Sequence, residues 1–450
     1  MVFFFNYFEE KSSELGFPFV CLFLIFQRHR EPPKFPCETE IELDRISGLS
    51  EHVLDQILSH LSIRDAVRTS TLSSKWRCKW AKIPNLVFDS NCIASPSQDQ
   101  ALIKNKLVSV VDHVLLLHRE ALNKFKLSHR ELVGVTDIDR WILHLSWRPV
   151  NEFILEIWKG TRYKIPSCLF SYQNLIHLEL FNCLLRPPSS FKGFRNLKSL
   201  DLQHVTLAQD AFENLITNCP LLERLTLMNF DGFSHLKISA PNLQFFDIGG
   251  AFDDVSFEHT FQLTLVSIGL YDRNVALSGS SSKLLSFFAN LPHIRRLEVQ
   301  SYFLKYLAMG NVPTRLPKPC IDLNYLSIRV NFNDMDESAA ALCLLKSSPN
   351  LQEVEMLARP EEQSGGRTMN SSWEDEHWTN LLLQLRSVKI VGISGVQAEL
   401  DCIKFLLSNS PALERMTIKP ISVDGGWDLL KELLRFRRAS VLAEIIYLDP

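Results

Sequence analysis

One short phrase recurs ten times between Leu175 and Ile418, and it constrains the fold more than any other feature of this chain. Each copy has an apolar residue, two variable residues, a second apolar residue, one variable residue and a third apolar residue. A phrase repeated every few tens of residues is typical of a solenoid, in which each repeat stacks on its neighbours. The copies begin at Leu175, Leu197, Leu222, Leu243, Leu263, Ile294, Leu323, Leu351, Leu385 and Leu413.

The end of each copy alternates apolar and polar residues, as a half-buried β-strand does. In the third copy we expect Leu225 and Leu227 to point inward, and Arg224, Thr226 and Met228 to point outward. One such strand cannot bury its apolar face alone, so neighbouring strands must stack in parallel. The intervals are irregular: for example, 22 residues separate the first two copies and 34 separate the eighth and ninth. Because leucine-rich repeats span about 20–29 residues, the longer intervals indicate insertions.

Four intervals carry an amphipathic pattern that ends just before a proline. Proline cannot continue a helix, and it favours an extended conformation in the residue before it. The chain then re-enters a strand, as in NCPLLERLTL. An ordinary α/β domain with strands that merely look alike is the alternative to a solenoid. The predicted helices are Ala208–Asn218, Lys283–Asn290, Ser338–Lys346 and Gln397–Leu407.

Composition restricts the class of protein further. A chain of 450 residues is too long for one core, so two or three units are expected. The net charge of −3 gives no strong field for nucleic acid or an anionic membrane. Ten cysteines without a CxxC pair indicate reduced thiols in a cytoplasmic or nuclear protein, and zinc is not expected.

Residues 1–40 do not fit the rest of the chain. The apolar run Leu15–Phe26 is shorter than the ~20 residues that span a bilayer. Glu9 and Glu10 precede it, where a secretory signal has basic residues. We expect a poorly ordered apolar and basic extension, or translated sequence outside the functional protein, without membrane association. A membrane tether or an uncleaved signal is the alternative.

Residues 44–89 predict a small helical module. Ser62 is a favoured helix N-cap, and Asp65 follows three residues later, close to the capping-box pattern. Trp76 and Trp80 are four residues apart and would share one face of a helix. Three short helices make only a small core, so the module is expected to gain stability from a partner helix. The predicted helices are Glu51–Leu61, Arg64–Thr69 and Ser74–Lys82.

This stretch resembles an F-box, the motif that docks a Skp-like adaptor and, through it, a cullin. The matching residues are D-R-I-S-x-L, V-L-x-x-I-L-S-H-L, D-A-V-R-T-S-x-L-S-x-K-W-R and the trailing Trp80. One departure is Ser50, because the family usually has proline after Leu49. By position, the resemblance implies that the adaptor-facing residues are Leu49, Ile57, Leu58, Leu61, Val67, Leu72 and Trp76. The alternative is that these side chains only fill the core of the module.

The remaining chain is similar to a large plant family with an F-box followed by irregular leucine-rich repeats. Leu385–Pro420 resembles the FBD segment that closes many of those chains. The implied fold class is α/β: a small all-α three-helix F-box module, then an irregular leucine-rich-repeat solenoid with a parallel β-sheet on its concave face. The expected parts are the extension 1–40, the F-box 41–89, a bridge 90–150, repeats 151–360, and an FBD-like segment 361–450 that continues the solenoid.

The bridge is expected to contain a helix over Gln98–His118 and a strand at Phe125–Leu127, with Phe153–Ile157 as a candidate eleventh strand. No Walker loop, GxSxG, HExxH or GxGxxG motif is present. The WEDEHW stretch at Trp373–Trp378 is polar and is expected to be a solvated loop. We therefore expect no catalytic residue, no metal and no cofactor.

The resemblance implies a substrate-recognition subunit of an SCF-type ubiquitin ligase, located in the cytoplasm or nucleus. Its partners would be the Skp-like adaptor, a cullin through it, and an unknown protein substrate, with no nucleic acid. A leucine-rich-repeat scaffold without ligase activity is the alternative, and an enzyme with an unrecognised site is the third reading. Since protein interfaces favour aromatic residues and arginine, the candidate substrate-binding residues are Phe181, Arg224, Phe245, Arg296, Tyr325, Arg329 and Arg415.

Overall fold

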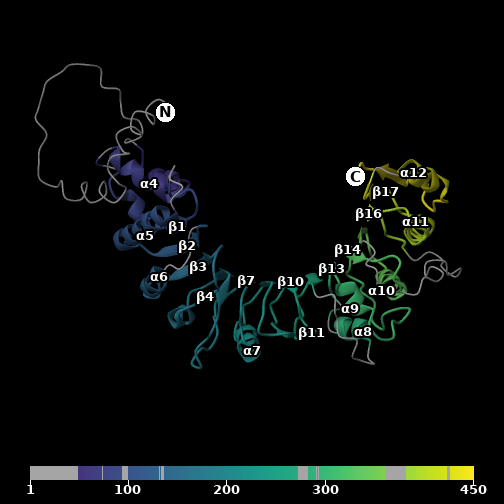
Figure 1. The fold of residues 1–450 in the computed structure, drawn as a ribbon, viewed down its shortest axis with the longest axis horizontal. Helices are drawn as coiled ribbons and strands as arrows, with labels where there is room; N and C mark the ends of the chain where they lie inside the picture. The colour runs from purple at the N-terminus through teal and green to yellow at the C-terminus, as the bar shows by residue number, and fades with distance from the viewer. Residues whose placement is uncertain are drawn as a thin grey trace, which may run out of the picture. The chain divides into compact units, whose positions relative to one another are not determined.

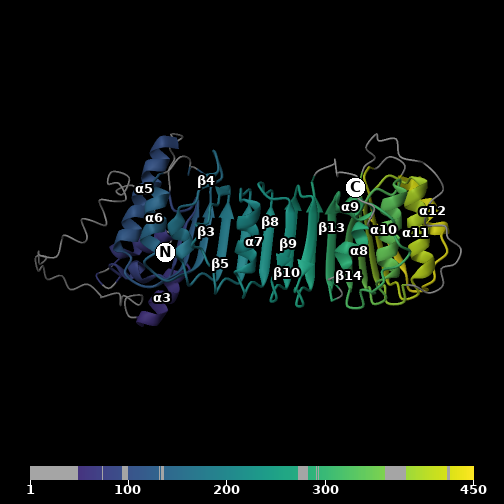
Figure 2. The same cartoon turned by 90° about the horizontal axis from the view of Figure 1, so that it is seen from below.

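Figures 1 and 2 show a computed structural model of the chain. It describes residues 49–72, 74, 76–93, 100–130, 132, 136–271, 282–289, 291, 293–359, 382–422 and 426–450. The predicted extension at 1–40 and the predicted loop at 373–378 lie outside these residues. The chain divides into two compact units, unit 1 (Met1–Phe191) and unit 2 (Lys192–Pro450). Among the described helices, none has both the length and the apolar character that a membrane span requires.

Unit 1 begins with two short helices and two 3-10 turns: α3 (Glu51–Ser59), α4 (Ile63–Arg68), η1 (Thr69–Thr71) and η2 (Lys79–Lys82). The predicted cap of the second helix is confirmed, because the Asp65 backbone N–H donates to Ser62 Oγ at 3.2 Å. The Ser62 hydroxyl in turn donates to the Asp65 carboxylate at 2.8 Å. These paired contacts satisfy a helix-end N–H that would otherwise lack a partner.

The third predicted helix, Ser74–Lys82, is wrong in its extent. Cys78 has a left-handed backbone with φ 61°, and only Lys79–Lys82 forms a 3-10 turn. A left-handed residue cannot continue the hydrogen-bond ladder of a right-handed helix. Trp76 and Trp80 nevertheless both enter the core, each with 3% of its surface exposed. The apolar pattern therefore predicted the burial of both indoles but not the backbone that achieves it.

The rest of unit 1 is a parallel sheet with the order β1-β2-β3-β5 and helices between its strands. The predicted helix at 98–118 and strands at 125–127 and 153–157 are observed as α5, β2 and β3. Strand β1 and helix α6 were not predicted. Phe88, Phe125 and Phe153 contact one another from adjacent strands, with ring centroids 5.9 and 5.6 Å apart; the Phe125 and Phe153 rings are stacked. The elements are β1 (Asn85–Phe88), α5 (Gln100–Leu117), β2 (Leu122–Ser128), α6 (Asp137–Leu145), β3 (Val150–Glu156), β4 (Tyr163–Lys164), η3 (Ser167–Ser171), β5 (His177–Phe181) and β6 (Cys183–Leu184).

Unit 2 continues the repeats. Its main-sheet strands line the inner side of its curve, and its helices lie on the outer side (Figure 1). The first elements are β7 (Ser199–Gln203), α7 (Gln209–Thr217), β8 (Arg224–Met228), β9 (His235–Ser239), β10 (Phe245–Gly250), β11 (Asp254–Glu258), β12 (Leu265–Leu270) and α8 (Lys283–Phe288). The remaining elements are β13 (Arg296–Ser301), α9 (Phe303–Leu307), β14 (Tyr325–Val330), α10 (Met335–Lys346), β15 (Glu353–Ala358), β16 (Ser387–Ile393), α11 (Gln397–Asn409), β17 (Arg415–Pro420), α12 (Gly426–Arg435) and β18 (Glu444–Tyr447).

The strands of this sheet follow the order β7-β8-β10-β12-β13-β14-β15-β16-β17-β18, and all pairs are parallel (Figure 2). The predicted stacking is confirmed: Leu225 pairs with Phe246, and Leu227 with Ile248. All four of these side chains are buried. Because the phrase keeps one register from strand to strand, its second and third apolar positions form continuous rows through the core.

Two of the intervals are too short to hold a helix. The copies that begin at Leu222, Leu243 and Leu263 are only 21 and 20 residues apart. Here the outer layer is formed by β9 and β11, which pair with each other in parallel. Repeat length thus decides whether the outer layer is helix or strand, and sequence periodicity alone did not predict this second sheet.

Buried carboxylates hold the N-terminal ends of two long helices in unit 2. Glu337 of α10 has none of its surface exposed and accepts the Asn331 backbone N–H at 3.0 Å. Glu399 of α11 accepts the backbone N–H groups of Ser394, Gly395 and Val396 at 2.9, 2.7 and 3.1 Å. A carboxylate in the first turn suits both the free N–H groups and the helix dipole. Through these hydrogen bonds, each glutamate connects its helix to the loop that follows the preceding strand.

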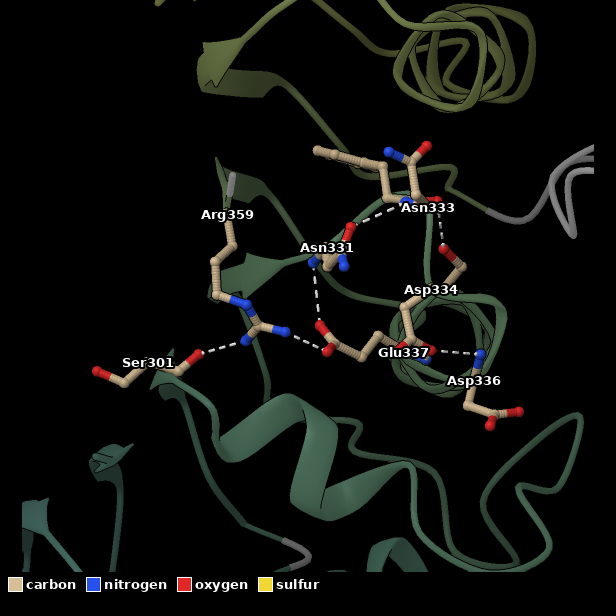
Figure 3. Close-up of polar contacts among 9 residues, drawn as sticks. Ser301, Asn331, Asn333, Asp334, Asp336, Glu337 and Arg359 are labelled. Carbon is tan, nitrogen blue, oxygen red and sulfur yellow. Dashed lines mark hydrogen bonds and ion pairs between the residues drawn. The ribbon is translucent and has the colours of Figure 1, made fainter. Parts of the chain in front are cut away.

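Arg359 joins the first of these carboxylates to a neighbouring repeat (Figure 3). Its guanidinium pairs with Glu337, donates to the Ser301 carbonyl at 2.8 Å, and lies over the Tyr302 ring at 4.6 Å. Asp334 caps the same helix by accepting the backbone N–H groups of Asp336 and Glu337. The exits of β13, β14 and β15 are thereby tied into one polar cluster.

Candidate functional site

The helical module of residues 49–88 has a closed core and a separate set of exposed apolar side chains. Leu54, Leu58, Ile63 and Ala66 are at most 4% exposed and form its centre with Trp80. The Glu51 carboxylate pairs with Lys79, which links α3 to η2. The module is therefore packed before any partner is considered.

The seven candidate adaptor-facing residues divide into two groups. Leu58, Val67 and Trp76 are buried at 0, 6 and 3% exposure, so in this structure they fill the core. Leu49 is partly buried. The exposed members are Ile57 at 38%, Leu61 at 38% and Leu72 at 64%.

Ile57 and Leu61 are four residues apart along α3 and its C-terminal turn, so they share one side of the helix. Exposed leucines are individually common, but three large aliphatic side chains are exposed here on a module with a small core. The sequence pattern could not separate this group from the core group, since both follow the same helical period.

The second candidate surface is the side of the unit 2 sheet that faces away from the helices, on the concave side of the curve (Figure 1). Residues on this side are called outward, because they point away from the core. Arg224, Phe245, Arg296, Tyr325 and Arg415 occupy aligned outward positions on their strands, as the sequence predicted. The Arg224 guanidinium lies 4.1 Å from the Phe245 ring centroid, and that of Arg296 lies 3.6 Å from Tyr325. Such stacking holds the aromatic rings and the cations in fixed positions.

A hydrogen-bonded charge group continues from Tyr325. Its hydroxyl donates to Glu355 at 3.0 Å, and Lys389 donates to the same carboxylate at 2.7 Å. Burial and this contact raise the pKa of Tyr325 to about 12. Burial works against ionisation of Glu355, but the Lys389 and Tyr325 contacts prevail and lower its pKa. This part of the face therefore carries charges that are already paired.

The other predicted residues have different neighbours. Arg329 is exposed at the end of β14. Arg415 borders a shallow hollow of about 490 Å³ with Glu353, Ser387 and Glu444. Phe181, in unit 1, packs against Trp158 with ring centroids 4.7 Å apart. Trp158 was not predicted, although its side chain is 49% exposed beside a strand end.

Neither surface contains a grouping typical of a catalytic centre. Among the residues that the structure describes, no group of three or more His, Cys, Asp or Glu is arranged to hold a metal ion. Cys92, Cys183, Cys219, Cys320, Cys343 and Cys402 are free thiols buried in the core. Burial raises the pKa of the Cys92 thiol to about 12 and that of Cys219 to about 11, which disfavours the reactive thiolate.

Comparison with known families matches three consecutive parts of the chain. Residues 46–88 match the F-box domain, and residues 380–418 match the FBD. Residues 138–356 match the family described as FBD-associated F-box protein At5g56370, LRR repeats. The matched F-box segment contains the module with the exposed Ile57, Leu61 and Leu72.

Individual relatives match nearly the whole chain. The F-box/FBD/LRR-repeat protein At1g13570 of Arabidopsis thaliana is 40% identical over 416 residues, which are 90% of this chain and 99% of that protein. The FBD-associated F-box protein At1g66310 from the same plant is 27% identical over 91% of this chain and 97% of its own length. F-box/FBD/LRR-repeat protein At5g53840 is 27% identical over 84% of this chain and 88% of its own length.

A helical docking module followed by a parallel repeat sheet with an aromatic and charged outward face defines a protein-interaction adaptor. The chain belongs to the plant family of F-box/FBD/LRR-repeat proteins.

Proposed function

We propose that this chain is the substrate receptor of an SCF-type cullin ubiquitin ligase. Its helical module docks a Skp-like adaptor that joins a cullin, and the outward sheet face of unit 2 holds the protein to be ubiquitylated. The chain contributes no covalent chemistry to this reaction. It raises the effective concentration of one protein beside another, which accelerates transfer without a catalytic group. We place this activity in the cytoplasm or nucleus.

The observation that supports docking is the exposure of Ile57, Leu61 and Leu72 on a module whose own core is complete. These side chains lie within the segment that matches the F-box. Complete burial of a fully exposed side chain of this kind contributes roughly 1.5–3 kcal/mol. Ile57 and Leu61 expose 38% of their surface and Leu72 exposes 64%, so each would contribute a corresponding part of that free energy in contact with a partner.

The substitution at Ser50 does not favour the scaffold alternative. Ser50 has φ −66° and ψ 155°, and its side chain makes no capping hydrogen bond to α3. Proline fixes φ near the same value, so serine here keeps the entry geometry that proline would give. Serine in place of proline mainly makes the unfolded chain more flexible. It removes few contacts from the folded chain.

The direct test is the affinity of the full chain for a purified Skp-type adaptor, measured by isothermal titration. Leu72→Asp places a charge on an exposed position, so it should leave the fold intact. It should weaken binding by about 30-fold or more, as expected for an interface hot spot. Leu116→Asp is the matched control, because Leu116 is 77% exposed on α5 outside the F-box segment.

Circular dichroism would verify that both variants fold. The proposal is refuted if Leu72→Asp, alone and combined with Ile57→Asp, binds the adaptor as tightly as the natural chain does.

A further inference from the structure

One row of outward residues crosses seven strands of unit 2 and alternates carboxylate and hydroxyl side chains. Neighbouring members are register partners in the parallel sheet. Because adjacent strands lie about 4.8 Å apart, successive carboxylates are roughly 10 Å apart. The row is Asp201, Thr226, Asp247, Ser267, Glu298, Ser327 and Glu355.

The carboxylates of this row differ in how they are neutralised. Glu298 accepts from Arg296 at 2.8 Å, and Glu355 accepts from Lys389 at 2.7 Å. Asp247 is half-buried and accepts a hydrogen bond from the Ser267 side chain. Among the described residues, no lysine, arginine or histidine forms an ion pair with it. Burial raises the pKa of Asp247, with Glu298 adding to the effect, so a cation brought to this position would be favoured.

Along the strands, apolar side chains border Asp247 on one side and glycines on the other. Phe245 precedes it on β10, and Leu265 is the register partner of Phe245 on β12. The Arg224 guanidinium lies over the Phe245 ring, 4.1 Å from its centroid. On the other side of Asp247 the sheet carries Gly249 and Gly269, which are also register partners.

These two glycines make room for a tyrosine ring. A Cβ on Gly249 would lie 2.3 Å from the Tyr271 hydroxyl and 2.9 Å from the Met228 sulfur, and one on Gly269 would lie 3.3 Å from the Tyr271 ring. Tyr271 therefore lies against the sheet, yet it stays 46% exposed. An exposed aromatic ring on a rigid support is a favourable contact for an aliphatic stem or a cation.

The outward positions of β7, β8, β10 and β12 carry two carboxylates, Asp201 and Asp247, and one cation, Arg224. The Arg224 guanidinium is stacked on the Phe245 ring. This small excess of negative charge favours a basic partner over an acidic one.

We propose that the outward face of β7, β8, β10 and β12 binds a basic, partly apolar segment of the partner protein. A lysine or arginine head meets Asp247, and its methylene stem packs between Phe245 and Tyr271, as long cationic side chains do on mixed surfaces. This inference rests on the proposed function, because the partner is taken to be the protein that the ligase ubiquitylates.

The probe is a fluorescent eight-residue peptide that alternates lysine and leucine, compared with a peptide that has glutamate in place of each lysine. Binding to the full chain in complex with the adaptor is measured by fluorescence anisotropy. The lysine peptide should bind, and more salt should weaken it. Asp247→Asn should lower its affinity about tenfold or more, as loss of a close charge pair does. Asp210→Asn, an exposed position on α7 away from the sheet, is the matched control and should bind like the natural chain.

Gly249→Ala provides a second variant, since its Cβ would displace Tyr271 and should also weaken the lysine peptide. The inference is overturned if the glutamate peptide binds equally well or if Asp247→Asn has no effect. It is also overturned if the face is occupied by a second copy, seen as a dimer that Asp247→Asn dissociates. Adaptor affinity measured on the same variants separates the two proposals, because failure of this one leaves adaptor binding unchanged.

Discussion

Replacement of Arg359 by methionine should destabilise unit 2 more than any change at an exposed ion pair. The Arg359 side chain is only 9% exposed, and the Glu337 carboxylate that it contacts has no exposed surface. Methionine keeps most of the side-chain volume but removes the cation, and it also removes the donor to the Ser301 carbonyl. The buried carboxylate would then keep only the Asn331 N–H among the contacts described above.

The expected loss in the free energy of unfolding follows from the burial of the Arg359–Glu337 ion pair. Breaking a buried ion pair by removing one partner typically costs about 3–5 kcal/mol, because the other charge stays in the interior. Lys198→Met is the matched control: Lys198 and Glu223 form a 2.8 Å pair in the same unit, but their side chains are 50 and 36% exposed. Loss of such a surface pair costs about 0–1 kcal/mol.

The assay is urea unfolding followed by circular dichroism at neutral pH, repeated at mildly acidic pH. Burial raises the pKa of Glu337 even in the natural chain, and loss of Arg359 should raise it further. A carboxyl group with a raised pKa binds its proton more tightly in the folded state, so folding gains stability as the pH falls. The deficit of Arg359→Met should therefore shrink at acidic pH. Equal unfolding midpoints for Arg359→Met and Lys198→Met would refute this reasoning.

Three further outcomes follow. His118 is 1% exposed, with Nε2 2.8 Å from the Ile83 carbonyl, and burial lowers its pKa. Unit 1 should therefore lose stability as the pH falls through the ordinary histidine range. In thermal melts, His118→Gln should flatten this dependence of stability on pH. Gly193→Ala should cost about 1–3 kcal/mol or more in urea unfolding, because φ is 84° and the new Cβ would lie 1.9 Å from the Asn218 carbonyl oxygen. Trp76→Ala should cost about 3–5 kcal/mol and unfold the helical module, which loss of its amide protection from hydrogen exchange would reveal.

The repeat phrase predicted the parallel sheet because every copy places its apolar residues at the same spacing, and register follows from that spacing. It could not predict β9 and β11, since a short alternating stretch such as HLKIS lacks the phrase. Helix α10 begins at Met335, three residues before the predicted start, because Asp334 caps it. Its first turn also contains the buried Glu337, whose ion-pair partner, Arg359, is 22 residues away in the sequence. Long-range pairing of this kind leaves no local pattern.

For the candidate docking residues, too, the local sequence did not predict which side chains are buried and which are exposed. Leu58 and Leu61 belong to one apolar stripe, yet Leu58 is fully buried and Leu61 is 38% exposed. The same module buries Trp76 and Trp80 on either side of a left-handed residue at Cys78, and the helical period of the sequence does not predict that backbone. The repeat pattern places Asp247 on the outward side of its strand, but it does not predict the alternating row. The members of the row are 20 or more residues apart, and only the strand register brings them together.

The central claim is that docking and partner binding use separate surfaces, one in residues 49–72 and one on the sheet of unit 2. Hydrogen–deuterium exchange of the full chain with and without a Skp-type adaptor tests it most directly. If the surfaces are separate, the adaptor should add protection within residues 49–72 and leave exchange in β7 to β17 unchanged. Unchanged exchange at residues 49–72, or protection spread over the outward strands instead, would contradict it.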